Sequence, residues 1–151
     1  MLRIRTITMI TLGLMILPGV ISASTCTPTE ADALGPFYKP GAPVRSRVGT
    51  GYVLQGTVHS TADCSALPGA VIEFWLAGPS GKYDDAHRAT VTADRKGAYR
   101  FESNRPGPYY GRPPHIHLRV SAQGFRTLVT QHYPAQGTKE GVFDVVLVPG
   151  N

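Results

Sequence analysis

The residues most able to do chemistry lie in residues 106–118, where two histidines, an arginine and two tyrosines fall close together. His115 and His117 are two positions apart, so on an extended strand both side chains point to one face and can bind one metal ion. Tyr109 precedes them across a proline-rich turn. A phenolate ligand needs a hard, highly charged cation at neutral pH, because the free phenol has a pKa near ~10. The pattern therefore indicates a metal site that suits ferric iron better than zinc.

The strand expected at residues 115–121 must position these imidazoles. Alternation places His115, His117 and Arg119 on one face and three apolar residues, which we expect in the core, on the other. Without further context, a half-exposed polar face is the alternative to a metal site. Tyr83 is too remote in the sequence for spacing alone to implicate it.

Short runs rich in β-branched and aromatic residues alternate with prolines and glycines along the rest of the chain, which predicts an all-β sandwich or barrel. The sequence shows no long amphipathic helix. The glycine in residues 94–97 favours a hairpin turn between two of the expected strands. These strands are 52–59, 70–77, 89–93, 98–102, 115–121, 126–132 and 141–148.

The first 24 residues have the pattern of a secretory signal peptide. Arg3 and Arg5 form its charged start, and the apolar segment at residues 7–17 is shorter than the ~20 residues of a membrane helix. We expect cleavage near Ser24, which predicts a secreted or periplasmic protein without stable membrane insertion afterwards. A lipoprotein acylated at Cys26 is the alternative, although Thr25 is a poor match to the residue before such a cysteine.

The part of the chain after the leader suits one domain with one core. We expect residues 25–48, rich in Pro, Gly and Ala, to form an N-terminal arm over a β-sandwich catalytic domain at residues 49–151, because Phe37 and Tyr38 need to be buried. A flexible leader is the alternative. The formal net charge of +5 includes Arg3 and Arg5 of the leader, and the other basic residues are scattered, which argues against nucleic acid as a partner.

Cys26 and Cys64 are the two cysteines of the chain. In an exported protein they are expected to form a disulfide, which would tie the N-terminal segment to the loop before Leu67 and stabilise the fold by roughly 3–4 kcal/mol. The paired spacing of a cysteine metal site is missing.

Nine short motifs follow one another along nearly all of the chain after the leader. They are Gly35-Pro-Phe-Tyr38, Leu54-x-Gly-x-Val58, Leu67-Pro-Gly-Ala70, Glu73-x-Trp75, Gly81-x-Tyr83, Thr92-x-Asp-x-x-Gly97-x-Tyr99-x-Phe101, Pro106-Gly-Pro-Tyr109, Arg112-Pro-x-His-Ile-His117 and Thr130-Gln131-x-Tyr133. Each motif alone is weak, but their combined order is specific. In this order the chain resembles the intradiol ring-cleavage dioxygenases, the family of catechol and protocatechuate dioxygenases, whose fold is a β-sandwich.

The resemblance implies a non-haem Fe(III) centre bound by two tyrosinates and two histidines, which correspond here to Tyr83, Tyr109, His115 and His117. Tyr109 would also act as a base that accepts a substrate proton. Because Tyr110 is adjacent, it is the alternative to Tyr109, and a surface position is the alternative for Tyr83.

Two further residues match the family's substrate pocket. Arg112 would stabilise negative charge on the bound substrate, with a solvated loop charge as the alternative, and Gln131 would line the same pocket. Trp75 is expected in the core rather than against substrate.

The implied activity is cleavage of the ring of a catechol-type substrate, a small aromatic diol, with incorporation of both atoms of O2 into a cis,cis-muconate-type product. The alternatives are a secreted iron- or catecholate-binding β-sandwich with little turnover, and a transthyretin-like binding module without metal. A homodimer is possible. The short spacing between Tyr109 and His115 suggests a more open pocket than is usual in the family.

Overall fold

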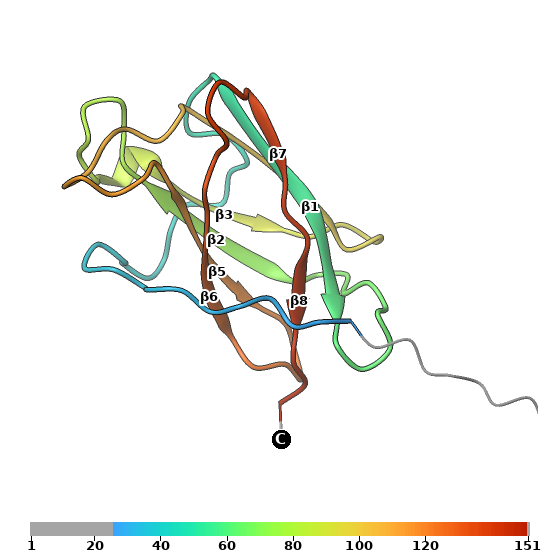
Figure 1. The fold of residues 1–151 in the computed structure, drawn as a ribbon. Coiled ribbons are helices and arrows are strands. Elements are labelled where there is room, and N and C mark those ends of the chain that lie inside the picture. The colour runs from blue at the N-terminus through green and yellow to red at the C-terminus, as the bar shows by residue number, and fades with distance from the viewer. Residues whose placement is uncertain (1–25, 151) are drawn as a thin grey trace, which may run out of the picture.

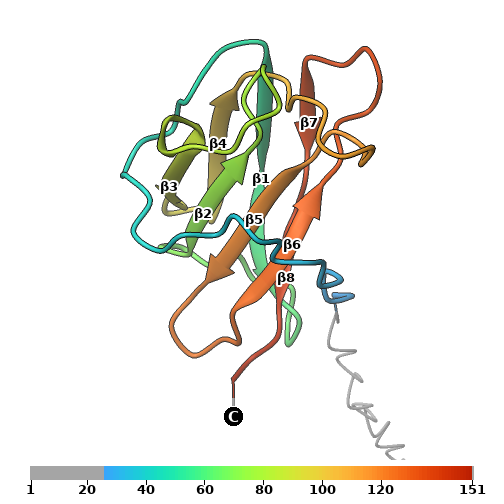
Figure 2. The ribbon, with the colours of Figure 1, turned by 90° about the vertical axis from the view of Figure 1, so that its left-hand side faces the viewer.

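The structure is a computed structural model that describes residues 26–150, and the expected signal peptide lies outside these residues. Two four-stranded sheets face each other (Figures 1 and 2). In one sheet β1 (Tyr52–Ser60) pairs with β4 (Ala98–Ser103), β7 (Glu140–Val142) and β8 (Val145–Leu147). The other has the order β3 (Arg88–Thr92), β2 (Val71–Leu76), β5 (Ile116–Ser121) and β6 (Leu128–His132). The prediction of an all-β sandwich is confirmed.

The hydrophobic core lies between the two sheets. Phe74 of β2 stacks on Phe101 of β4, with ring centroids 4.2 Å apart. As predicted, the three apolar residues of β5 belong to this core, namely Ile116, Leu118 and Val120. The opposite face of β5 is also covered, because His117 is buried. A sheet buried on both faces needs a third layer, which is supplied by the segment before β1.

Residues 26–48 form that layer as an N-terminal arm without regular secondary structure. The blue and cyan ribbon crosses β6, β5 and β2 in Figure 2. Its backbone is held along its length, because Thr29 N donates to Val146 O, Asp32 N to Val129 O and Thr90 N to Pro43 O. The arm therefore has fixed partners on β8, β6 and β3.

The predicted hairpin around residues 94–97 is wrong. The turn itself forms, since the Asp94 carboxylate accepts from the backbone N–H groups of Lys96 and Ala98. Its two flanking strands belong to different sheets, however, because β3 pairs with β2 while β4 pairs with β1. The turn is thus a corner that carries the chain from one sheet to the other.

The last predicted strand is interrupted after Val142, which gives β7 and β8 instead of one strand at 141–148. At the interruption the Asp144 carboxylate, rather than a backbone carbonyl, accepts from Thr57 N at 2.8 Å. Phe143 N still donates to Gln55 O. The Asp144 side chain takes the place of a backbone acceptor at this point, so the pairing with β1 stops after β7 and resumes with β8.

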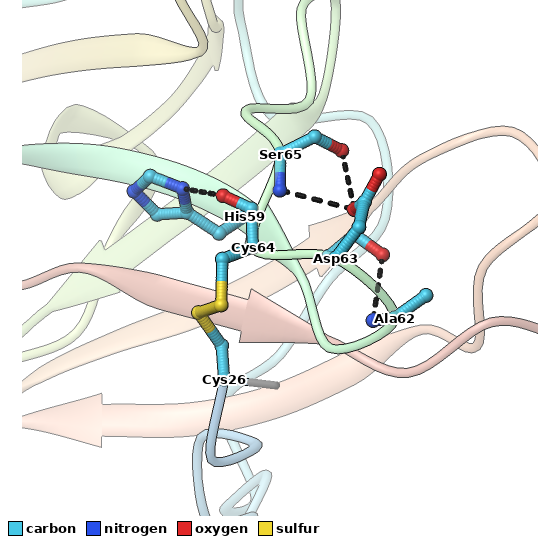
Figure 3. The surroundings of a disulfide bond; sticks show 7 residues. Cys26, His59, Ala62, Asp63, Cys64 and Ser65 are labelled. Atoms are coloured by element: carbon cyan, nitrogen blue, oxygen red, sulfur yellow. Dashed lines mark hydrogen bonds between the residues drawn. A yellow bond between two sulfur atoms is a disulfide. The ribbon is translucent and has the colours of Figure 1, made fainter. Parts of the chain in front are cut away.

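Cys26 and Cys64 form a disulfide, with their Cα atoms 5.3 Å apart (Figure 3). The expected pairing is confirmed, and the Cys26 sulfur is engaged in this bond rather than free for acylation. The bond joins the start of the arm to the loop after β1. Beside it the carbonyl of Cys64 lies 3.1 Å from His59 Nδ1.

Within residues 26–150, no helix has the length and apolar character needed to cross a membrane.

Candidate metal centre

Three side-chain donor atoms converge beneath the arm at the start of β5. The Tyr83 hydroxyl lies 3.1 Å from His115 Nε2 and 3.4 Å from His117 Nε2, and the two Nε2 atoms are 3.2 Å apart. A metal ion with bonds of about 2.0–2.1 Å holds ligand atoms roughly 2.9–3.4 Å apart when they subtend angles near 90–110°. The spacing of the three donors therefore fits a shared metal ion.

The hydrogen bonding of His115 sets its tautomer for metal binding. Its Nδ1 lies 2.7 Å from the carbonyl oxygen of Pro113, so Nδ1 carries a proton and donates it. Nε2 then presents a lone pair toward Tyr83 and His117. A partner that fixes the remote ring nitrogen in this way is typical of metal-bound histidines.

His117 is held by stacking. Its ring stacks on that of Trp75, with ring centroids 4.7 Å apart and an interplanar angle of 5°. The two residues are direct partners in the pairing of β2 with β5. A Cβ atom on Gly35 would approach His117 Cε1 to 3.2 Å, and the φ of +72° at Gly35 also suits glycine. The arm and Trp75 thus confine the imidazole ring.

Burial keeps both histidines neutral at pH 7. It lowers the pKa of His115, and it lowers the pKa of His117 to about 4, with the adjacent His115 and Arg112 acting in the same direction. A neutral imidazole binds a metal without first losing a proton.

Tyr83 comes from the loop between β2 and β3. Its ring stacks on Phe37 of the arm, with centroids 4.4 Å apart and an interplanar angle of 10°. Burial raises the pKa of Tyr83 to about 12, opposed by Arg112 and reinforced by Tyr109. The phenol is therefore protonated at pH 7 unless a strong cation replaces the proton.

Tyr109 and Tyr110 occupy different environments. Arg112 N donates to Tyr109 O, and Tyr110 and Gly111 both have positive φ, which is the pattern of a type I′ turn. This turn leaves Tyr110 at its tip with 89% of its surface exposed. The Tyr109 ring instead packs edge-on against Tyr83 at 5.4 Å and Phe37 at 5.2 Å. We call the Tyr83 hydroxyl and the Nε2 atoms of His115 and His117 the donor triangle. Of the two neighbouring tyrosines, Tyr109 is the one whose ring packs against Tyr83 of this triangle.

Arg112 and Gln131 belong to a polar network beside His115. Arg112 Nη2 donates to Gln131 Oε1 at 3.0 Å and to the Tyr133 hydroxyl at 3.2 Å. The Tyr133 hydroxyl donates to Asp32 Oδ2 at 2.8 Å, and Gln131 Nε2 donates to Ala33 O at 2.6 Å. The network orients the guanidinium and ties the arm to β6.

Several residues that surround the donors were not among the predicted site residues. Phe37 and Gly35 lie in the motif Gly35-Pro-Phe-Tyr38, which was the available sequence signal for them. Asp32 had no such signal, because its contact with Tyr133 joins positions far apart in the chain. Trp75 is buried as expected, but it also stacks on a histidine of the site.

The donor set is a mixed one. Within residues 26–150, no group of three or more His, Cys, Asp or Glu side chains could hold a metal ion. The convergence of two imidazoles with a phenol is therefore the metal-binding chemistry that the described part of the chain offers. Phenolate donors suit a hard trivalent cation such as Fe(III).

Several known dioxygenases resemble this chain in sequence. A chlorocatechol 1,2-dioxygenase of Pseudomonas putida is 31% identical over an alignment 140 residues long, which covers 70% of this chain and 54% of that protein. A hydroxyquinol 1,2-dioxygenase of Nocardioides simplex is 34% identical over an alignment 135 residues long, which covers 68% of this chain and 46% of that protein. The chain thus spans about half the length of these curated relatives.

A solved structure resembles this protein over a larger share of the chain than the sequence relatives do. The dioxygenase domain of a dioxygenase carbohydrate-binding protein fusion from Streptomyces sp. SirexAA-E superposes with a TM-score of 0.74 and 29% identity, covering 82% of this chain and 100% of that one. No protein-family model matches the chain. Sequence relatives and fold together show that the chain belongs to the intradiol ring-cleavage dioxygenase family.

Proposed function

We propose that this protein is a non-haem Fe(III) dioxygenase that cleaves the ring of catechol-type substrates with O2 to give cis,cis-muconate-type products. The observation that carries the proposal is the convergence of the Tyr83 hydroxyl with the Nε2 atoms of His115 and His117 at 3.1–3.4 Å. The names of the relatives supply the substrate class, because they are dioxygenases of chlorocatechol and hydroxyquinol.

Tyr83, Tyr109, His115 and His117 would hold the iron. When bound, Fe(III) would act as a Lewis acid that lowers the pKa of a coordinated catechol. The chain supplies neutral imidazoles that need no deprotonation and a Tyr83 phenol whose proton only a strong cation displaces. This chemistry favours a trivalent ion over a divalent one.

Tyr109 would exchange a proton with substrate. Its ring lies against Tyr83 and Phe37 at the edge of the donor triangle, on a turn separate from β5. As a phenolate, Tyr109 would accept a proton from a catechol hydroxyl at its own oxygen.

Arg112 would act electrostatically on the substrate. Its guanidinium is oriented by Gln131 and Tyr133 beside His115, and a fixed cation there stabilises negative charge that develops on a deprotonated diol. Gln131 would position Arg112 and line the same pocket. A pre-oriented cation acts more strongly than one that must first reorganise.

The proposal extends to location and assembly. The pattern of residues 1–24 supports export, so we propose a secreted or periplasmic enzyme, and the disulfide is consistent with such a compartment. A homodimer is possible, with no nucleic acid partner and no stable membrane insertion after cleavage.

The first test uses the purified protein with its disulfide formed and Fe(III) added. We expect a tyrosinate-to-iron absorption band that shifts on anaerobic addition of catechol, followed by O2 uptake when air is admitted. His117→Ala should abolish iron binding and the band. His59→Gln is the matched control, because His59 lies beside the disulfide and not at the site.

Each other outcome has a definite meaning. A folded protein that stays colourless with Fe(III) would contradict the iron site. A band that shifts with catechol while no O2 is consumed would contradict the enzyme and leave an iron- and catecholate-binding protein.

A further inference from the structure

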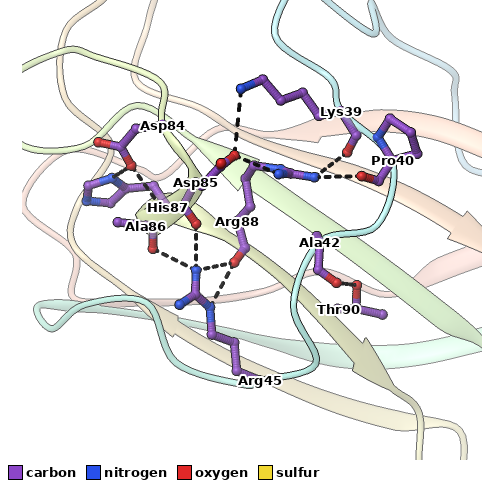
Figure 4. Close-up of polar contacts among 10 residues, drawn as sticks. All are labelled: Lys39, Pro40, Ala42, Arg45, Asp84, Asp85, Ala86, His87, Arg88 and Thr90. Carbon is purple, nitrogen blue, oxygen red and sulfur yellow. Dashed lines mark hydrogen bonds and ion pairs between the residues drawn. The ribbon is translucent and has the colours of Figure 1, made fainter.

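Two arginines join the arm to the segment that follows Tyr83 (Figure 4). Arg88, at the start of β3, is buried, and its guanidinium donates to Lys39 O at 2.5 Å, Pro40 O at 3.0 Å and Asp85 Oδ1 at 2.7 Å. One side chain of the β2–β3 region thus binds two successive carbonyls of the arm.

Arg45 makes the reciprocal connection from the arm. Its Nη2 donates to the carbonyls of Asp85 at 2.8 Å, Ala86 at 3.0 Å and Arg88 at 2.7 Å, and its Nε donates to Arg88 O at 2.9 Å. These carbonyls lie in and just after the short 3-10 helix η1 (Asp85–His87). A single guanidinium of the arm therefore provides hydrogen-bond donors for the backbone carbonyls in and just after η1.

Both halves of this connection lie next to the donor triangle. Tyr83 comes two residues before η1, and Phe37, which stacks on Tyr83, comes two residues before Lys39. The arginine bonds hold together the two chain segments from which Phe37 and Tyr83 come. We call Arg45 and Arg88 together the arginine clasp.

The loop that carries Tyr83 also has hydrogen bonds between its own residues. Asp84 accepts from the backbone N–H of His87 and lies 2.7 Å from His87 Nδ1, and Gly78 N donates to Lys82 O at 2.8 Å. A Cβ atom on Gly78 would lie only 2.5 Å from the His87 ring, so η1 packs directly on the start of the loop. A displacement of η1 would therefore be passed on to Tyr83.

We propose that the arginine clasp positions the Tyr83 hydroxyl for metal binding, so that Arg45 and Arg88 are positioning residues of the centre. The inference rests on the proposed function, in that Tyr83 is taken as a ligand. β5 places His117, with His115 immediately before it, but Tyr83 stands on a loop outside the regular pairing. The clasp and the Phe37 stack provide the fixed geometry that the strand provides for the histidines.

Guanidinium geometry is what this role requires. Arg88 reaches two carbonyls and a carboxylate at once with a planar fork, and Arg45 bonds three carbonyls. A lysine ammonium is a single point donor on a flexible stem and cannot reproduce these directions. Replacement by lysine should therefore restore only part of the effect.

The test is a double-mutant cycle with Tyr83, read out as Fe(III) affinity by competition with a chelator. We expect Arg88→Met and Arg45→Met each to weaken iron binding by about tenfold and to shift the tyrosinate band. In the Tyr83→Phe background the same changes should alter affinity less than about twofold, because the positioned ligand is already gone. Arg88→Lys should lie between wild type and Arg88→Met.

Arg47→Met is the matched control. Arg47 lies on the same arm but pairs with Glu102 of the other sheet, so its loss should leave iron affinity unchanged. Equal losses from the Met variants in both Tyr83 backgrounds would show a general structural role and overturn the proposal. Unchanged affinity in the Met variants would overturn it as well.

A metal-free measurement separates this proposal from the proposed function. Trp75 is the single tryptophan of the chain, and its ring packs against that of Tyr38 of the arm, with ring centroids 5.1 Å apart. Acrylamide quenching of its fluorescence in metal-free protein should increase in Arg88→Met and Arg45→Met but not in Arg47→Met. If Tyr83→Phe leaves iron binding unchanged, the proposed ligand set fails, while unchanged quenching would overturn the clasp.

Discussion

The two histidines of the site are alike in sequence but are held by different physical means. His115 is oriented by a hydrogen bond from Nδ1 to Pro113 O, whereas His117 is oriented by stacking on Trp75. Within the described residues, His117 Nδ1 is buried without a hydrogen-bond partner of good geometry. Protonating His117 therefore places a charge in a buried setting, and the resulting loss of hydration lowers its pKa more than the nearby Ala33 backbone and Asp32 raise it.

This burial predicts a pH dependence of stability in the metal-free protein. The pKa of His117 is about 4 when folded and about 6.5 when unfolded, so between these values the unfolded chain binds a proton that the folded protein does not. The free energy of unfolding should be unaffected by this group above pH 7. It should fall by about 2 kcal/mol between pH 7 and pH 5.

Urea unfolding of wild type and His117→Gln at the two pH values measures this contribution. The variant should lose about 2 kcal/mol less than wild type over the interval. An equal loss in both proteins would show that His117 is not the group responsible.

The two neighbouring tyrosines provide a second residue-level prediction. Tyr109→Phe should retain much of the iron, shift the absorption band and slow substrate deprotonation, because a phenolate is removed from the site. Tyr110→Phe should behave as wild type, since Tyr110 is exposed at the tip of its turn. Visible spectra and stopped-flow mixing with catechol distinguish the variants, and the reverse pattern would assign the ligand to Tyr110.

At the scale of elements, the three donors and their covering contacts come from one strand with the residue before it, one loop and the arm. β5 supplies His117, with His115 immediately before it, and the β2–β3 loop supplies Tyr83. The arm contributes Gly35 against His117 and Phe37 against Tyr83. An irregular segment thus completes a site whose other parts are held by regular pairing.

The disulfide anchors the arm at its start, well before these contacts. Replacing Cys26 and Cys64 with serine should lower the free energy of unfolding by about 4 kcal/mol, because the unfolded chain regains the freedom of a loop with a sequence separation of 38. Iron affinity should change little, since Thr29 and Asp32 still bind β8 and β6.

Chemical denaturation and chelator competition on the same double variant measure both quantities. Ser65→Ala, beside Cys64, serves as the control for a local change that keeps the bond. A large loss of iron affinity without the disulfide would show that the anchor, and not the contacts after it, holds the arm in place.

At the scale of the whole molecule, the two sheets must stay in register for the site to exist. Phe74 and Phe101 stack across the sheets, and the residue after Phe74 in β2, Trp75, points to the opposite face of the sheet and stacks on His117. Two neighbouring residues of β2 thus contact the core between the sheets on one face and the metal centre on the other.

Removing one of these rings should destabilise the protein as a whole. Phe101→Ala should lower the free energy of unfolding by about 3–5 kcal/mol, because it leaves a cavity between the sheets. Arg100→Ala changes the preceding residue, whose side chain is exposed, and should stay within about 0.5 kcal/mol. Thermal and urea unfolding measure both variants, and a small effect at Phe101 would contradict the central role of this stack.

The sequence alone determined most of the strands, the core-facing residues of β5 and the spacing of the histidine pair. These features depend on alternation within a few residues, which the backbone geometry of a strand dictates. The ordered motifs also indicated the family. The same local information led to the incorrect hairpin at residues 94–97, because a turn signal does not reveal which sheet each flanking strand joins.

Only the tertiary structure decided which distant residues meet. Spacing did not show the approach of Tyr83 to the histidines, which only the family resemblance implied. The stacking of Phe37 and the network from Asp32 to Arg112 also join segments far apart in the chain. Likewise, the burial that holds His117 neutral comes from Trp75 on another strand and from the arm. Such contacts depend on how the sheets and the arm pack together, and local sequence patterns carry no record of that packing.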